Sequence, residues 1–148
     1  MKQTLLIVAT LVLLASAGTC RRTVAVAEQP GDAFARLAGS RWRPVALYGQ
    51  AVDGTTDAFL ALDTATRRVA GNSGCNTFGG AYSRTAAGGA LQFSQMISTR
   101  KMCLGRNIEA QFTAALAATT RYALRGDTLV FLDGDGAELC LFTGEAND

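Results

Sequence analysis

The chain has 148 residues and carries 14 basic and 12 acidic side chains, which gives a formal charge of +2. This length suits one domain and is short for two. The near balance of charge excludes the strongly basic surface on which nucleic-acid binding depends. The sequence contains no histidine, which excludes Ser-His-Asp and Cys-His catalysis and the commonest zinc sites.

Residues 1–19 have the three parts of a secretory signal peptide. Lys2 provides a positive start, residues 5–14 form an uninterrupted apolar run, and Ala15-Ser16-Ala17 supplies small residues at a cleavage spacing. The apolar run is shorter than the ~20 residues that span a bilayer. We therefore predict export, which in a bacterium leads to the periplasm or cell envelope. Removal of this segment also removes Lys2, its one charged residue, and leaves a net charge near +1.

Cys20 follows directly and is a candidate for lipidation. The preceding Ala17-Gly18-Thr19 resembles the bacterial lipobox, although leucine is usual in place of Ala17 and a smaller residue in place of Thr19. The alternative is ordinary cleavage without a lipid. Two or three acyl chains on Cys20 would hold the protein at a membrane, whereas a single chain binds only marginally. Residues 20–38 are expected to form a tether, within which residues 34–37 can form one helical turn.

From residue 39 onward the hydrophobic pattern has mainly a period of two, which predicts strands. The predicted strands are 42–48, 58–62, 67–71, 80–83, 91–94, 122–124, 129–132 and 138–142. Pro44 indicates a sheet edge or a bulge within the first of them. The last two strands are apolar on both faces and are expected to lie centrally.

One stretch, residues 107–120, has a helical pattern instead. Ile108, Phe112 and Leu116 recur at helical spacing, and Asn107 is placed to act as the N-cap. We expect the apolar stripe to pack into the core. The complete order predicts an α+β, mostly β fold, namely a curled antiparallel sheet or partial barrel of about eight short strands with one inserted amphipathic helix.

Export also decides how the remaining cysteines are interpreted. In an oxidising compartment two of Cys75, Cys103 and Cys140 should pair, and the sequence allows three pairings. We predict a disulfide between Cys75 and Cys103, because both lie next to turn-rich segments whose backbone can adjust to the bond. Cys140 lies within an apolar strand and is expected to be a small buried hydrophobe. The predicted bond would stabilise the domain by ~3 kcal/mol.

The motif GNSGCNTFGGAY at residues 71–82 is the most informative stretch, and STRKMC follows it at 98–103. The order of these motifs resembles the META domain family, which includes the HslJ-like heat-inducible bacterial proteins. The resemblance also uses Gly39-Ser40-Arg41-Trp42, Leu91-Gln92-Phe93, Glu109, Phe112, Leu116, Tyr122 and Leu129. It implies an exported or lipid-anchored envelope protein associated with stress, for which no reaction is settled. We assign residues 39–148 to this META-like domain.

Five polar residues of these motifs lie near the predicted disulfide: Asn72, Ser73, Asn76, Ser98 and Thr99. They can be interpreted as a polar binding patch. We favour a structural role, because Asn and Ser side chains satisfy backbone groups where a glycine-rich chain turns tightly.

Three sequence motifs that would indicate a redox, phosphate-binding or calcium-binding site are each incomplete. Cys75 has no Cys-x-x-Cys partner, and residues 71–80 lack the Lys-Ser/Thr ending of a phosphate loop. The run DGDG at 133–136 lacks the later ligands of a calcium loop and is typical of a hairpin turn. We therefore predict no catalytic, cofactor-binding or metal-binding residues.

The leading hypothesis is a non-enzymatic envelope protein that binds or scaffolds in stress tolerance, with an N-terminal lipid in the membrane and an unknown envelope partner. One alternative is a carrier of a small apolar ligand, because a curled sheet can enclose such a pocket. Another is a redox-responsive protein in which Cys140 reshuffles the disulfide.

Overall fold

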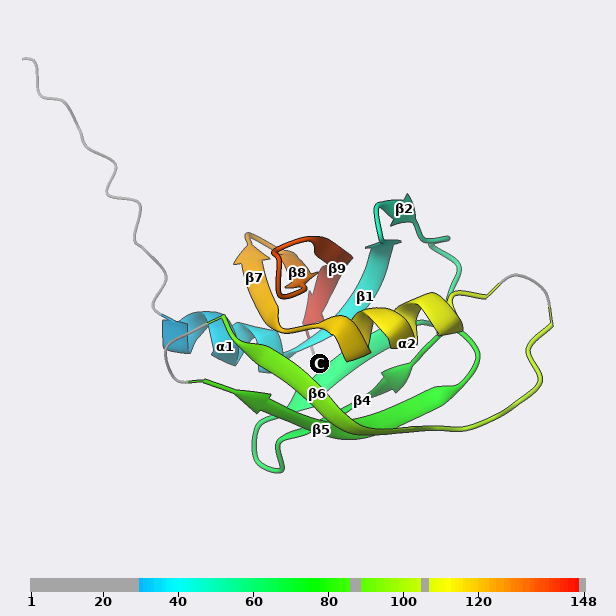
Figure 1. The fold of residues 1–148 in the computed structure, drawn as a ribbon, viewed down its shortest axis with the longest axis horizontal. Helices are drawn as coiled ribbons and strands as arrows, with labels where there is room; N and C mark the ends of the chain where they lie inside the picture. The colour runs from blue at the N-terminus through cyan, green and yellow to red at the C-terminus, as the bar shows by residue number, and fades with distance from the viewer. Residues whose placement is uncertain (1–29, 86–88, 105–106, 147–148) are drawn as a thin grey trace, which may run out of the picture.

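The computed structural model describes residues 30–85, 89–104 and 107–146, and a curled antiparallel sheet accounts for most of them (Figure 1). The predicted signal peptide and Cys20 lie outside the described residues. The strands are β1 Ser40–Leu47, β2 Gln50–Ala51, β3 Phe59–Asp63, β4 Arg68–Asn72, β5 Thr77–Arg84, β6 Leu91–Ser98, β7 Arg121–Arg125, β8 Thr128–Leu132 and β9 Glu138–Ala146. The helices are α1 Pro30–Ala38 and α2 Glu109–Ala118.

The sheet has the strand order β6-β5-β4-β3-β1-β9-β8-β7, and the short β2 pairs with β1 outside this path. Its two ends approach each other where Ala90 forms a bridge with Arg121. Two backbone hydrogen bonds support this contact, from Leu91 N to Thr120 O at 3.0 Å and from Tyr122 N to Gly89 O at 2.7 Å. The sheet is therefore a half-barrel, as the period-two pattern predicted.

Helix α2 connects β6 to β7 and lies over the concave side of the half-barrel (Figure 1). It packs against β6 on one side and against β1, β8 and β9 on the other. Phe112 and Leu116 are fully buried, which confirms that the predicted stripe belongs to the core. The helix begins at Glu109 with Ile108 as its N-cap, so the prediction of Asn107 as N-cap is wrong by one residue; Asn107 Oδ1 accepts a hydrogen bond from Glu109 N at 3.2 Å. None of the described helices has the length and apolar character to cross a membrane.

The interior of the half-barrel is filled by aromatic side chains. Phe112 of α2 packs against Phe142 with ring centroids 5.9 Å apart, and Phe142 packs against Phe131 at 4.9 Å. Trp42 is buried in the same cluster and its Nε1 donates a hydrogen bond to Leu37 O at 2.7 Å. Such ring pairs add to the free energy gained from burial alone.

The tether prediction is wrong at its C-terminal end. Residues 30–38 form helix α1, and its Phe34 and Leu37 are buried in the core cluster. These two side chains are three positions apart and share one helix face, so they pack against the sheet together. The folded domain therefore begins before residue 39.

Pro44 lies at a bulge rather than at an edge. Strand β1 is hydrogen-bonded to β3 on one side and to β9 on the other, and its register with β9 shifts between Pro44 and Ala46. Proline cannot donate to the ladder, and the irregularity accommodates it within an inner strand.

Substitution of Gly71, at the start of the glycine-rich motif, tests how tightly β4 packs against its neighbours. A Cβ at this position would meet the carbonyl oxygen of Phe59 and the ring of Phe78. We expect Gly71→Ala to lower the free energy of unfolding by about 2 kcal/mol, because backbone on one side cannot move away. A Cβ at Gly79, on the neighbouring strand, would lie 3.7 Å from Val69 O, which is an ordinary contact. Gly79→Ala should change stability by about 0.5 kcal/mol or less in the same denaturant titration. Equal losses for the two variants would contradict this packing.

Candidate functional site

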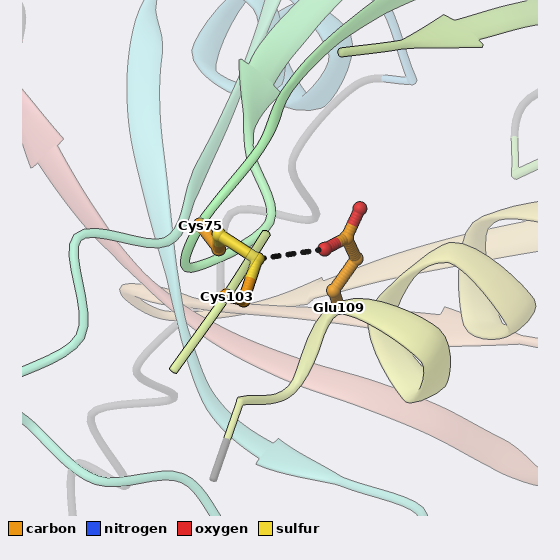
Figure 2. A group of neighbouring side chains, drawn as sticks. All are labelled: Cys75, Cys103 and Glu109. Carbon is orange, nitrogen blue, oxygen red and sulfur yellow. Dashed lines mark hydrogen bonds between the residues drawn. A yellow bond between two sulfur atoms is a disulfide. The ribbon is translucent and has the colours of Figure 1, made fainter. Parts of the chain in front are cut away.

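The disulfide joins the two sequence motifs at one end of the sheet. Cys75 lies in the connection between β4 and β5, and Cys103 lies in the segment between β6 and α2. The two residues are 28 positions apart in sequence and their Cα atoms are 6.0 Å apart. The predicted pairing is confirmed. The bond fixes the segment after β6 against the β4–β5 connection, directly in front of α2 (Figure 2).

The side chain of Asn76 organises the site. Its Oδ1 accepts hydrogen bonds from Thr99 Oγ1 at 2.8 Å and from Lys101 N at 2.7 Å. Its Nδ2 donates to the two carboxylate oxygens of Glu109 at 3.0 and 2.8 Å, and lies 3.5 Å from Cys103 Sγ. The side chain is 3% exposed, so almost every polar contact it makes is with protein. One amide thus holds the β6–α2 segment and the start of α2 together.

Glu109 brings a carboxylate to the disulfide. It lies in the first turn of α2, where a negative charge interacts favourably with the helix dipole. Figure 2 shows its carboxylate pointing toward Cys103, with Oε2 3.6 Å from Sγ. Sequence reasoning used Glu109 only for the family resemblance and missed this role. The available signal was an acidic residue in the first turn of a helix that closely follows a half-cystine.

The other predicted polar residues form hydrogen bonds mainly with nearby backbone groups. Ser73 is buried, and both its N and its Oγ donate to Asn76 O, at 2.8 and 2.9 Å. Asn72 Oδ1 accepts from Gly74 N at 2.7 Å. Thr99 pairs with Thr77 through its backbone N. Ser98 is exposed, and its Oγ donates only locally, to the Thr99 carbonyl at 3.0 Å.

Three ligand atoms of the kind that binds metal ions gather here. The sulfurs of Cys75 and Cys103 and a carboxylate oxygen of Glu109 all lie within 4.8 Å of one another. Zinc and other soft cations bind cysteine as the thiolate. In this structure the two sulfurs are bonded to each other, so a cation could use them only after reduction of the disulfide.

Cys140 lies apart from this site, in β9, and is buried as predicted. Its backbone pairs with Leu47 of β1 and Phe131 of β8. Burial raises the pKa of the Cys140 thiol well above its ordinary value. A thiol must be deprotonated to attack a disulfide, so this environment disfavours reshuffling by Cys140.

The segment held by the disulfide exposes large apolar side chains. Met102 and Leu104, on either side of Cys103, are each 91% exposed, and Ile97 near the end of β6 is 69% exposed. Arg100 and Lys101 are exposed beside them. The sequence analysis did not single out this combination. Its signal was the run RKMCL at 100–104, in which two basic residues are followed directly by three apolar ones.

These features define a mostly β, disulfide-stapled half-barrel domain. The sequence model of the META domain family matches residues 35–146, and the chain belongs to this family. No curated protein matches the chain.

Solved structures support the fold. An NMR structure of a protein from Burkholderia xenovorans superposes with a TM-score of 0.59 at 21% identity, over 80% of this chain and 90% of that one. A second NMR structure gives 0.59 at 16% identity, over 78% and 94%. The crystal structure of a DUF4847 family protein from Bacteroides vulgatus gives 0.58 at 12% identity, over 76% and 96%.

Asn76 should be the most sensitive polar residue of the site. We expect Asn76→Ala to lower the free energy of unfolding by about 3 kcal/mol, because it removes several hydrogen bonds at once, among them those from Lys101 N and to Glu109. Asn76→Asp should be at least as destabilising, since it places a second carboxylate against Glu109. Asn72→Ala removes one hydrogen bond at a half-buried position and should cost about 1 kcal/mol. Urea titrations measure all three, and a loss at Asn76 no larger than at Asn72 would refute its central role.

The disulfide is expected to contribute about 3.5 kcal/mol, because it closes a loop of 28 residues in the unfolded chain. The double variant Cys75→Ala/Cys103→Ala should lose most of this stability in guanidinium titrations. A reductant provides the matched control, since it should destabilise the parent protein and leave the double variant unchanged. A similar effect of reductant on both proteins would show that the bond is not the cause.

Proposed function

We propose that this chain is a non-enzymatic, exported protein of the bacterial cell envelope that acts by binding at a membrane surface. Cys20 would provide a lipid anchor, and the segment Ile97–Leu104, here called the apolar loop, would provide a second contact. The role in stress tolerance follows from the family resemblance. The single observation that carries the membrane contact is the 91% exposure of both Met102 and Leu104.

The apolar loop is held in place although its side chains face solvent. Cys103 is tied to Cys75, and the backbone of Lys101 is bonded to Asn76 through its N–H at 2.7 Å. Met102 and Leu104 therefore stay exposed because the backbone between and beside them is fixed. Large apolar groups held in water in this way are typical of interaction surfaces. Burial of each of these side chains in an apolar environment would contribute about 1.5–3 kcal/mol of favourable free energy.

The charge of the apolar loop fits an anionic lipid surface. Residues 97–104 contain Arg100 and Lys101 and no acidic residue. Each basic residue close to an anionic leaflet contributes about 1 kcal/mol. A single acyl chain binds a membrane only weakly, so stable attachment needs a further contact. The basic and apolar side chains of the apolar loop together can provide it.

The two alternative functions receive less support. A carrier of an apolar ligand requires space inside the half-barrel, and Trp42, Phe112, Phe131 and Phe142 fill that interior. A disulfide reshuffled by Cys140 requires a reactive thiol, and burial keeps this one protonated. Binding through the apolar loop uses side chains that are already exposed.

Vesicle sedimentation tests the membrane contact with a Cys20→Ala chain, which cannot be lipidated. This chain should bind vesicles rich in phosphatidylglycerol, bind phosphatidylcholine vesicles weakly, and dissociate as salt is raised. Met102→Ser/Leu104→Ser should weaken binding about tenfold or more, because two apolar contacts are lost. The matched control is Val45→Ser/Tyr48→Ser, which alters exposed apolar residues outside the loop and should bind like the parent.

Two results would overturn this function. One is the absence of binding to phosphatidylglycerol vesicles, and the other is equal binding by the Met102/Leu104 variant and the parent. Thermal unfolding of each variant checks that the substitutions leave the fold intact, as expected for side chains that are 91% exposed.

A further inference from the structure

A second feature lies away from the disulfide. A cavity of about 310 Å³ opens between α1, the β3–β4 turn and the end of β5. Its lining residues are Phe34, Ala35, Thr64, Arg67, Tyr82 and Arg84. Tyr82 and Arg84 are near the end of β5 that is opposite to Thr77, the residue that follows Asn76. The cavity therefore does not depend on the apolar loop.

Two arginines line this cavity. The Arg84 Cζ lies 4.0 Å from the centroid of the Phe34 ring, which holds the planar group against an aromatic wall. Arg67 has a left-handed backbone with φ 54°, and its carbonyl accepts a hydrogen bond from Tyr82 N at 3.0 Å. Among the described residues, neither arginine forms an ion pair with a carboxylate.

Both positive charges lie close to the hydroxyl of Tyr82. Burial raises the pKa of Tyr82, and the charge of Asp63 raises it further, whereas the charges of Arg84 and Arg67 lower it. The hydroxyl itself donates to Asp63 O at 3.3 Å. Tyr82 therefore lies next to both the aromatic side of the cavity, at Phe34, and its two arginines.

The neighbouring acid, Asp63, is engaged in the turn rather than with the arginines. Its carboxylate accepts hydrogen bonds from Thr66 Oγ1 and Ala65 N, each at 2.8 Å. The bonds from Thr66 and Ala65 lower the pKa of Asp63, so it stays charged and bound to the turn. That turn carries Thr64 and Arg67 into the cavity lining.

We propose that this cavity binds a small organic anion, a molecule with a carboxylate or phosphate group and an aromatic or aliphatic body. The anionic group would lie between Arg67 and Arg84, because the guanidinium fork matches carboxylate and phosphate oxygens. The apolar body would lie against Phe34 and Tyr82. The volume is at the small end of the range for ligand sites, which limits the ligand to a small molecule.

Titration of the ¹⁵N-labelled exported protein with benzoate, phenyl phosphate and inorganic phosphate tests this site by NMR. Benzoate or phenyl phosphate should cause saturable shifts confined to the arginine Nε–H signals of Arg67 and Arg84 and to amides around the cavity. Arg84→Gln and Arg67→Gln should each weaken binding about tenfold, because each removes a charge-assisted hydrogen bond. Arg100→Gln, which removes an exposed arginine of the apolar loop, should leave the affinity unchanged.

Three outcomes would overturn the proposed site. The first is the absence of saturable shifts with every probe. The second is unchanged affinity in both cavity variants, provided that their amide spectra show a folded protein. The third is equal affinity for inorganic phosphate and phenyl phosphate, since the apolar wall would then contribute nothing. The vesicle experiment is independent of all three.

Discussion

The buried amide of Asn76 is the interaction on which the disulfide-bearing end of this domain depends. It contacts three groups: the hydroxyl of Thr99 and the backbone of Lys101 in the segment after β6, and the carboxylate of Glu109 at the start of α2. An amide presents both donors and an acceptor, so it can serve all three at once. Aspartate at this position would lack the donors that Glu109 requires. The half-barrel could close without this residue, but the segment between β6 and α2 would lose its fixed path.

The disulfide and Asn76 act on different states of the chain. The covalent bond between Cys75 and Cys103 mainly restricts the unfolded ensemble and does not by itself select one loop conformation. The hydrogen bonds of Asn76 exist only in the folded state and set the direction of the backbone. Helix α2 then links this arrangement to the core, because Glu109 faces the site while Phe112, three residues later, packs under Phe78 and Phe142. Loss of core packing around Phe112 would thus be transmitted to the site.

Much of this organisation could be predicted from local sequence patterns. The period of two indicated the strands, Pro44 indicated an irregularity in β1, and the position of two cysteines in turn-rich segments indicated the disulfide. Of helix α1, only one turn at residues 34–37 was predicted, because its large apolar residues are Phe34 and Leu37, within a stretch of small residues that resembles a linker. The role of Glu109 and the placement of Arg67 and Arg84 at one cavity depend on how segments far apart in sequence come together. Hydrophobic periodicity carries no information about such contacts, so only the fold could reveal them.

Strand β5 explains how one small domain can carry two separate surfaces. At its first residue, Thr77 is hydrogen-bonded to Thr99 and supports the apolar loop. At its last residues, Tyr82 and Arg84 line the cavity. An extended strand rises about 3.3 Å per residue, so eight residues separate the two ends by more than 20 Å. Hydrogen bonds to β4 and β6 on both sides hold β5 extended, with one irregularity between Gly79 and Ala81. A ligand in the cavity and a membrane under the apolar loop could therefore be bound at the same time without competing for a single side chain.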